Sequence, residues 1–126
     1  MKKRIFISFA IENKNLRDLL IGQRNNEYSS IDFIDMSVKE PWSSNWKTQC
    51  RTKIKGCHGM IIILTKDSVN ADGQIWEMKC AEEEGVPMIG LWGQSIDKNC
   101  KLPSEMPNIR IYDWKWKTIS EWVDKL

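Results

Sequence analysis

An unbroken apolar run near the middle of the chain is the strongest structural signal in the sequence. Residues 60–64 read Met-Ile-Ile-Ile-Leu, with no polar residue among them. A strand that other elements cover on both faces has this pattern, because neither face meets water. The run therefore predicts the central strand of a parallel sheet. Turn and capping residues fill 65–72, and apolar residues at helical spacing predict a helix over 73–84.

The rest of the chain repeats this alternation of apolar runs and helical patterns. Strands are expected at residues 5–9, 31–35, 86–92 and 108–112, and helices at 12–26, 46–57 and 119–126. The run at 31–35 is short and more polar, which predicts a place near an edge of the sheet. Alternating strands and helices favour right-handed crossovers with helices on both faces. We therefore expect a single α/β domain over residues 1–126, a flavodoxin-like three-layer sandwich around a five-stranded parallel sheet.

Length, charge and cysteine usage exclude several classes of protein. The 126 residues suit one domain with its own core. A net charge of +2 is too balanced to favour nucleic acid as a partner, and no apolar run approaches the roughly 20 residues that cross a membrane. The four cysteines form no C-x-x-C pair and the first residues show no signal-peptide pattern, so we expect reduced thiols in the cytoplasm.

Several known uses of this fold class lack their motifs in this sequence. Neither G-x-G-x-x-G nor G-x-x-x-x-G-K-[ST] occurs, which argues against a Rossmann dinucleotide loop and a P-loop. The residues after the first strand, 8–12, offer one hydroxyl and no glycine, so an FMN phosphate loop is not expected. A phospho-receiver would need acidic residues after the first strand and an aspartate ending the third, but Phe9-Ala10 and Leu64-Thr65 stand there. Function must therefore come from another site.

The cysteines and the only histidine do not suggest a catalytic or metal centre. His58 follows Cys57 directly, and adjacent residues on a strand point to opposite faces, which makes their cooperation difficult. Cys50, Cys57 and Cys80 have the spacing of apolar helix positions, and free cysteine is commonly a small buried residue. We expect no bound metal.

Glu77 is the carboxylate with two competing interpretations. Ile75, Trp76 and Met78 surround it in the helix that follows the central strand. As a charge near the start of a helix, it would face solvent and gain roughly 0.3–1 kcal/mol from the helix dipole. Alternatively it lies beyond the carboxyl ends of the strands, where open α/β sheets bind ligands. The residues themselves leave both interpretations open.

A resemblance to a known family favours the second interpretation. The family signal lies in Lys-Arg-Ile-Phe-Ile-Ser-Phe at 3–9, Asp-Phe-Ile-Asp at 32–35, and Gly-Met-Ile-Ile-Ile-Leu-Thr at 59–65 followed by Trp76-Glu77. In order and spacing these segments resemble the Toll/interleukin-1 receptor (TIR)-like domains of bacteria. The nearest likeness is to the small TIR-like family that includes the NAD-dependent signalling subunit of the Thoeris anti-phage defence system. The resemblance covers roughly residues 3–92 and implies a TIR-type version of the three-layer sandwich.

The resemblance also implies an activity and a site. TIR enzymes cleave the bond between nicotinamide and ribose in NAD+, and their catalytic glutamate corresponds to Glu77. Such a carboxylate can hold the ribose hydroxyls and stabilise the cationic oxocarbenium as nicotinamide departs, without a metal. The implied NAD+-binding residues are Phe6, Ser8, Phe9, Ala10, Asp35, Trp42, Trp46 and Trp76.

Partners and product follow from the same resemblance. The loop at 36–45 corresponds to one that covers the site and joins protomers in TIR domains, which implies a homo-oligomer on activation. The product would be ADP-ribose or cyclic ADP-ribose, an antiviral signal to a downstream effector. The family's usual tryptophan four residues before the glutamate is Gly73 here, and the acidic trio 82–84 is the alternative source of a carboxylate.

A non-catalytic interaction module is the alternative from another class of function. Trp42, Trp92, Trp114 and Trp116 lie in or near expected loops. Tryptophan is favoured at protein interfaces, although packing in a core is its commoner role. Such a module would bind partner TIR or effector domains without consuming nucleotide, so turnover separates the two hypotheses.

Overall fold

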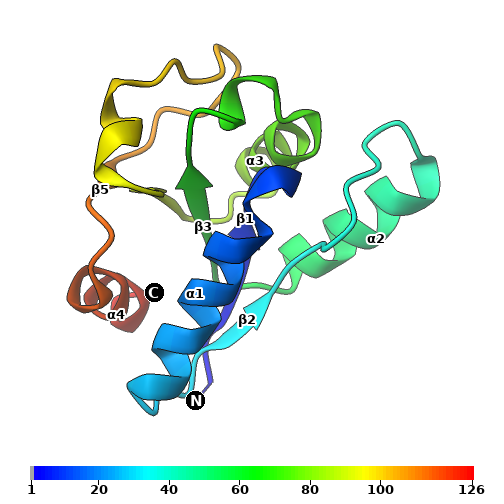
Figure 1. The fold of residues 1–126 in the computed structure, drawn as a ribbon. Coiled ribbons are helices and arrows are strands. Elements are labelled where there is room, and N and C mark those ends of the chain that lie inside the picture. The colour runs from blue at the N-terminus through cyan, green and yellow to red at the C-terminus, as the bar shows by residue number, and fades with distance from the viewer. Residues whose placement is uncertain (1) are drawn as a thin grey trace.

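The apolar run at the centre of the sequence forms the central strand β3 (Gly59–Leu64), in which every residue is buried. In the computed structural model, which describes residues 2–126, β3 belongs to a five-stranded, all-parallel sheet with strand order β2-β1-β3-β4-β5 (Figure 1). The other strands are β1 (Arg4–Ser8), β2 (Asp32–Ile34), β4 (Met88–Trp92) and β5 (Ile111–Tyr112). The predicted α/β class and five-stranded parallel sheet are confirmed.

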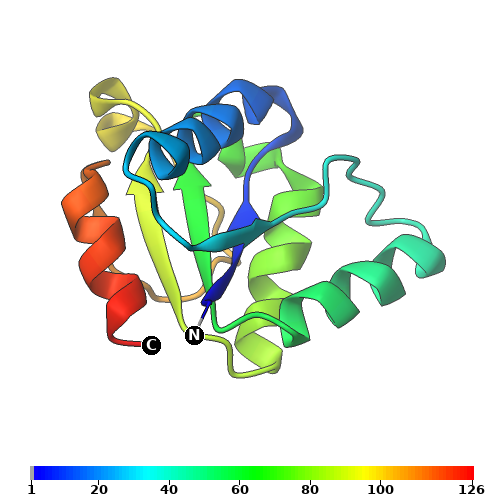
Figure 2. The same ribbon diagram turned by 90° about the horizontal axis from the view of Figure 1, so that it is seen from below.

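Four α-helices cover the sheet on both faces (Figure 2). They are α1 (Lys14–Asn26), α2 (Ser44–Lys55), α3 (Asp72–Glu83) and α4 (Trp116–Asp124), and the 3-10 helices are η1 (Ile11–Asn13), η2 (Ser68–Asn70) and η3 (Ser95–Asn99). Apolar residues of α2 and α3 form one buried cluster with the sheet, and those of α1 and α4 form the other. This is the flavodoxin-like three-layer arrangement. No helix among residues 2–126 has the length and apolar character needed to cross a membrane.

Both edge strands are shorter than the sequence pattern predicts, and β5 is the more shortened of the two. The run at 31–35 gives the edge strand β2, as expected from its polar residues. The pattern at 108–112 contributes only Ile111 and Tyr112 to β5, because pairing with β4 is limited to Gly90 with Ile111 and Leu91 with Tyr112. The loop before β5 contains η3.

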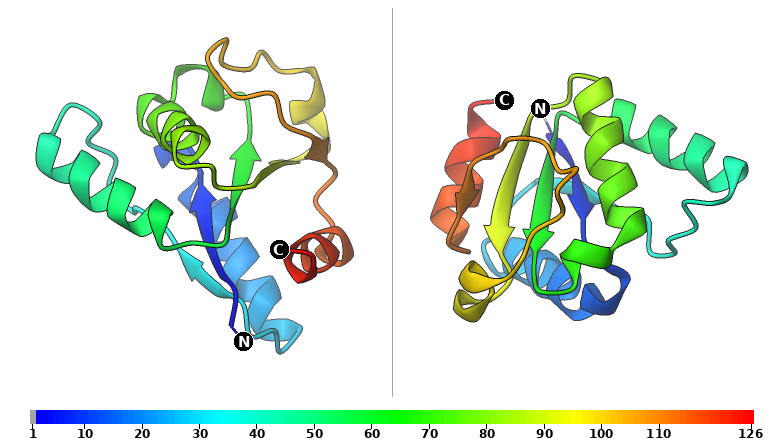
Figure 3. Two further views of the ribbon diagram at one scale, coloured as in Figure 1. Left: turned by 180° about the vertical axis from the view of Figure 1, so that it is seen from behind. Right: turned by 90° about the horizontal axis from the view of Figure 1, so that it is seen from above.

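Lys3 donates to the carbonyl of Leu126, so the two ends of the chain lie side by side (Figure 3).

Side-chain alternation along β1 decides which residues can reach α3. Phe6 belongs to the buried cluster on the α2 and α3 side, whereas Ile5, Ile7 and Phe9 belong to the opposite cluster. Ser8 shares the orientation of Phe6, because residues two apart on a strand face the same way. Ser8 also pairs with Ile62 of β3, so its hydroxyl lies near the carboxyl ends of both strands and points toward α3.

Candidate active site

The carboxylate of Glu77 lies in the interior of the molecule and does not face solvent. Its side chain is 0% exposed, and both of its oxygens accept hydrogen bonds. The hydroxyl of Ser8 donates to Oε1 at 2.8 Å, and the ammonium of Lys39 donates to Oε2 at 2.7 Å. Three segments of the chain therefore meet at this group: the end of β1, the loop after β2, and α3.

Lys39 is the unexpected member of this group. Its side chain is 5% exposed, and its Nζ lies 4.0 Å from the centroid of the Phe9 ring. The ammonium thus has a carboxylate oxygen and an aromatic face as neighbours, both of which attract a cation. A buried ion pair of this kind needs well-placed hydrogen bonds to offset the loss of hydration.

Burial makes Glu77 a weaker acid than a free glutamate. Removal from water raises its pKa from 4.5 to about 7, against the opposing effects of Lys39 and of the hydrogen bond from Ser8. A carboxyl group that titrates near neutral pH beside a cleft is a common feature of functional sites. In its burial and its raised pKa, Glu77 resembles a functional carboxylate and differs from a charge on the surface.

The absence of a side chain at Gly73 allows Lys39 to reach Glu77. A Cβ at position 73 would lie 2.7 Å from Cβ of Lys39 and 3.2 Å from its Cγ, closer than packed carbon atoms approach. Gly73 is in the first turn of α3 and Glu77 lies one turn further on. The stem of Lys39 therefore crosses the helix at the glycine and extends along it to the carboxylate.

The loop that carries Lys39 is held where α2 begins. The indole nitrogen of Trp46 donates to the carbonyl of Val38 at 2.6 Å, and the Ser43 hydroxyl caps α2 by accepting from the backbone nitrogen of Trp46. The Trp46 ring also packs edge-on against Trp76 of α3, with ring centroids 5.4 Å apart. Trp46 is thus a structural anchor for the segment that places Lys39.

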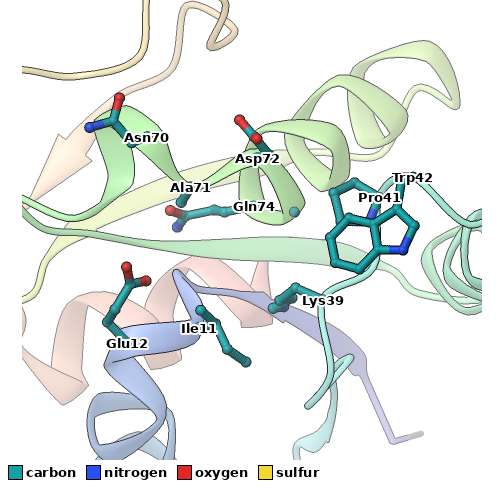
Figure 4. Close-up of a pocket in the computed structure, with 10 residues that line it drawn as sticks. Ile11, Glu12, Lys39, Pro41, Trp42, Asn70, Ala71, Asp72 and Gln74 are labelled. Carbon is teal, nitrogen blue, oxygen red and sulfur yellow. The ribbon is translucent and has the colours of Figure 1, made fainter.

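A small cleft opens beside Lys39, between η1, the loop after β2 and the start of α3 (Figure 4). Its volume is about 160 Å³. Ile11 and Glu12 lie across the opening from Asn70 and Asp72, while Pro41 and Trp42 stand at one end, the end where Lys39 also lies. Lys39 lines the cleft and covers Glu77, so a ligand in the cleft meets the lysine first.

Gln74 joins the cleft to the sheet. Its side chain is 0% exposed, and its amide nitrogen donates to the carbonyls of Ser8 and Ile63. These two bonds tie the first turn of α3 to the carboxyl ends of β1 and β3. Its Oε1 is buried and has no hydrogen-bond partner within residues 2–126.

The structure brings together only part of the predicted set. Ser8 and Phe9 contact the Lys39–Glu77 pair directly, Ala10 follows them, buried, just before η1, and Trp42 is 76% exposed beside the cleft.

The other predicted residues have different surroundings. Phe6 is fully buried in the core. Asp35 forms an ion pair with Arg17, and Trp76 lies under the guanidinium of Arg51, at a groove formed by α2. The hydrogen bonds to the Glu77 carboxylate come from Ser8 and Lys39 and not from these three side chains, although the charge of Asp35 helps to raise the pKa of Glu77.

The residues that sequence patterns do not reveal are Lys39, Gly73 and Gln74. Lys39 lies in an irregular loop with no periodicity, and no local signal pairs it with a carboxylate 38 positions away. A buried, hydrogen-bonded glutamine has the same sequence signature as a solvated one. The glycine at position 73, at the expected start of the helix, is the one local sign that another segment could pass close to the backbone there.

The alternative centres weighed from the sequence do not assemble. The Nδ1 atom of His58 accepts from the backbone nitrogen of Arg4, and burial raises the pKa of Cys57 to about 11, so it remains a thiol. Glu83 and Glu84 pair with Arg51 at the end of α3. Within residues 2–126, no cluster of three or more histidine, cysteine or acidic side chains is arranged to hold a metal ion.

Fold and site together define a flavodoxin-like α/β protein with a buried glutamate–lysine pair at the carboxyl ends of its strands. No protein-family model matches the chain. No curated protein matches it significantly. Its function is therefore inferred from the chemistry of the site.

Proposed function

We propose that this chain is a cytoplasmic TIR-like enzyme that cleaves NAD+ between nicotinamide and ribose, as part of anti-phage signalling. The observation that carries the proposal is the buried carboxylate of Glu77, in the helix after the central strand and next to the cleft that Lys39 lines. Ligands of open α/β sheets bind at this end of the strands. The segment order that resembles TIR-like domains supports the same residue as the catalytic group.

The chemistry needs an anion next to a developing cation. When the bond between C1′ of the ribose and the ring nitrogen breaks, the electron pair leaves with nicotinamide, which becomes neutral. The positive charge moves onto the ribose as an oxocarbenium ion. A fixed carboxylate in a site that excludes water stabilises that ion more strongly than water does. Glu77 is suited to this role because it is buried and positioned by Ser8.

The second step decides the product. Water that attacks C1′ loses a proton and gives ADP-ribose, whereas a nucleophile within the ADP-ribosyl group itself gives a cyclic product. Either product would act as a signal to a downstream effector. The cleft of about 160 Å³ is smaller than the roughly 300–1,000 Å³ of typical small-molecule sites. A neighbouring protomer and a moved loop would supply the rest of the site in a homo-oligomer.

Consumption of NAD+ by the purified protein tests the proposal. The assay follows nicotinamide release at high protein concentration, with mass spectrometry of the nucleotide product. Glu77→Gln keeps the size of the side chain and removes the charge. Glu82→Gln is the matched control, because Glu82 is an exposed carboxylate on the same helix. Turnover that Glu77→Gln abolishes and Glu82→Gln retains is the expected result, and equal turnover in both variants would refute the role of Glu77.

An interaction module is the second candidate, and one observation favours it. Val38 and Trp42 are 56% and 76% exposed on the loop after β2. Exposed apolar residues on one loop suit a contact with another protomer. Trp92, Trp114 and Trp116 are partly buried against the two core clusters, which leaves Trp42 as the loop tryptophan free for a partner. Absence of NAD+ turnover in assembled protein would favour this candidate.

A further inference from the structure

Glu77 and the Phe9 ring form a niche for a positive charge. One carboxylate oxygen lies 2.7 Å from the ammonium that fills the niche, and the ring centroid lies 4.0 Å from the same atom. An anion on one side and an aromatic face on the other attract organic cations in general. The chemistry of the niche is therefore not specific to a lysine.

In the present arrangement no ligand can use this niche. The Glu77 side chain is 0% exposed, and hydrogen bonds from Ser8 and Lys39 occupy both of its oxygens. The cleft next to it reaches Lys39 but not the carboxylate. A catalytic role for Glu77 thus requires the lysine to leave first.

The segment that carries Lys39 has the features of a movable element. Met36 and Trp46 are buried and anchor its two ends, while Ser37, Val38, Glu40 and Trp42 between them are exposed. Between those ends, one hydrogen bond from Trp46 to the carbonyl of Val38 holds the backbone. Lys39 itself is held by its ion pair with Glu77, its position over Phe9 and its passage across Gly73. Exposed loops with few buried contacts open at low free-energy cost.

We propose that Lys39 is an internal competitor for an organic-cation subsite made by Glu77 and Phe9. Withdrawal of the segment 37–43 removes the lysine and admits a cationic ring or a cationic transition state in its place. The inference rests on the proposed function, since a nicotinamide dinucleotide carries such a ring. The free protein is then held in a closed state. Its apparent affinity for the cation equals the affinity of the open state multiplied by the fraction of molecules that are open.

Two substitutions free the niche of the Lys39 ammonium in different ways. Gly73→Ala places a methyl group 2.7 Å from the present position of Cβ of Lys39, too close for both to stay, and leaves every charge in place. Lys39→Ala removes the competitor itself. Gly22→Ala is the matched control, because Gly22 lies in α1 and a Cβ there meets no atom within 4 Å. Circular dichroism and a cooperative melting curve establish that each variant folds.

Binding of 1-methylnicotinamide, a permanent cation, is compared with binding of neutral nicotinamide of similar shape. Measurements are made by calorimetry or NMR at pH 8.5. We expect Gly73→Ala and Lys39→Ala each to tighten binding of the cation by on the order of tenfold, as a population shift toward the open state predicts. The neutral compound should change by less than about twofold, and Gly22→Ala should match the unmodified protein. Adding Glu77→Gln to Lys39→Ala should abolish the preference for the cation.

The outcomes separate this inference from the proposed function. If both variants bind the cation no more tightly than the unmodified protein does, Lys39 is not a competitor, whatever the turnover of NAD+. If both bind it more tightly and none consumes NAD+, the cation subsite stands and the enzymatic proposal falls. If NAD+ is consumed, kcat/KM should rise by about the same factor as the affinity for the cation in Gly73→Ala, and an unchanged value would overturn the role of the lysine.

Discussion

The helix α3 carries two contacts of the same kind in opposite surroundings. Near its middle, Glu77 pairs with Lys39 at side-chain exposures of 0% and 5%. At its end, Glu83 pairs with Arg51 at exposures of 62% and 36%. The exposed pair connects α3 to α2 at the surface, where water competes for both charges and the contact contributes at most about 1 kcal/mol.

The difference shows what burial does to a charge. In the exposed pair, either partner can be removed and water replaces it. In the buried pair, the loss of Lys39 leaves a carboxylate with one hydrogen bond and little hydration, so the remaining group is destabilised. The buried pair is therefore the place where a ligand that supplies a positive charge gains most. Four substitutions or conditions test how far this contrast extends.

The largest expected effect is the loss of stability when the buried pair is broken. Lys39→Met keeps the length of the side chain and removes its charge, and we expect the free energy of unfolding at pH 8 to fall by about 3 kcal/mol. Arg51→Met, the same change at the exposed pair, should cost less than about 1 kcal/mol. Urea denaturation of both variants measures the contrast. Equal losses in the two variants would mean that burial does not distinguish the pairs.

The next effect is the pH dependence that Glu77 gives to stability. Its pKa in the folded protein is about 7, against 4.5 for the free side chain. At pH values between these two, the folded state therefore binds more protons than the unfolded state. Stability should therefore fall as pH rises from about 4.5 to about 7, by about 3 kcal/mol in total. Glu77→Gln should lack this component. If the unmodified protein instead gained stability relative to Glu77→Gln as the pH rises over this range, the raised pKa of Glu77 would be contradicted.

The fold was predictable from the sequence because its signals are local. The run at 60–64 and the helical spacing of 73–84 each specify an element without reference to the rest of the chain. β5 was predicted too long, because its length depends on how far β4 offers partners, which is a tertiary property.

The candidate site was predictable only in part. The position of Glu77 after the central strand made it a candidate, and the resemblance to TIR-like domains favoured it over the interpretation as a surface charge. Lys39 could not be found in the same way, because its role depends on a loop path that Gly73 permits and Trp46 anchors. Ser8 and Phe6 show the same limit: strand alternation places both on one face, but only the structure shows that Ser8 reaches Glu77 and that Phe6 is packed in the core.

The third effect concerns activity. If Glu77 stabilises the oxocarbenium ion, Glu77→Gln should lower kcat for NAD+ cleavage by at least about 100-fold, the size seen when one stabilising group is lost from a preorganised site. Glu84→Gln, at the C-terminal cap of α3, removes a carboxylate that pairs with Arg51 and should leave kcat within about twofold, since Glu84 is partly exposed and takes no part in the buried pair. Nicotinamide release measured by chromatography gives both numbers. A comparable loss in Glu84→Gln would mean that the charge of the helix, and not the buried site, governs turnover.

The smallest effect sharpens the contrast between the loop and the rest of the molecule. Trp46→Phe keeps an aromatic ring against Trp76 but removes the N–H that donates to the carbonyl of Val38. Loss of one buried hydrogen bond should lower the free energy of unfolding by about 1 kcal/mol. That bond holds the segment 37–43. The amide hydrogens of this segment should therefore exchange faster in Trp46→Phe, while those of β3 change only with global stability. Trp76→Phe is the control, because it changes the same aromatic pair and leaves the bond to Val38 intact. If the amide hydrogens of the loop exchange faster in that variant as well, ring packing and not the hydrogen bond from Trp46 holds the loop.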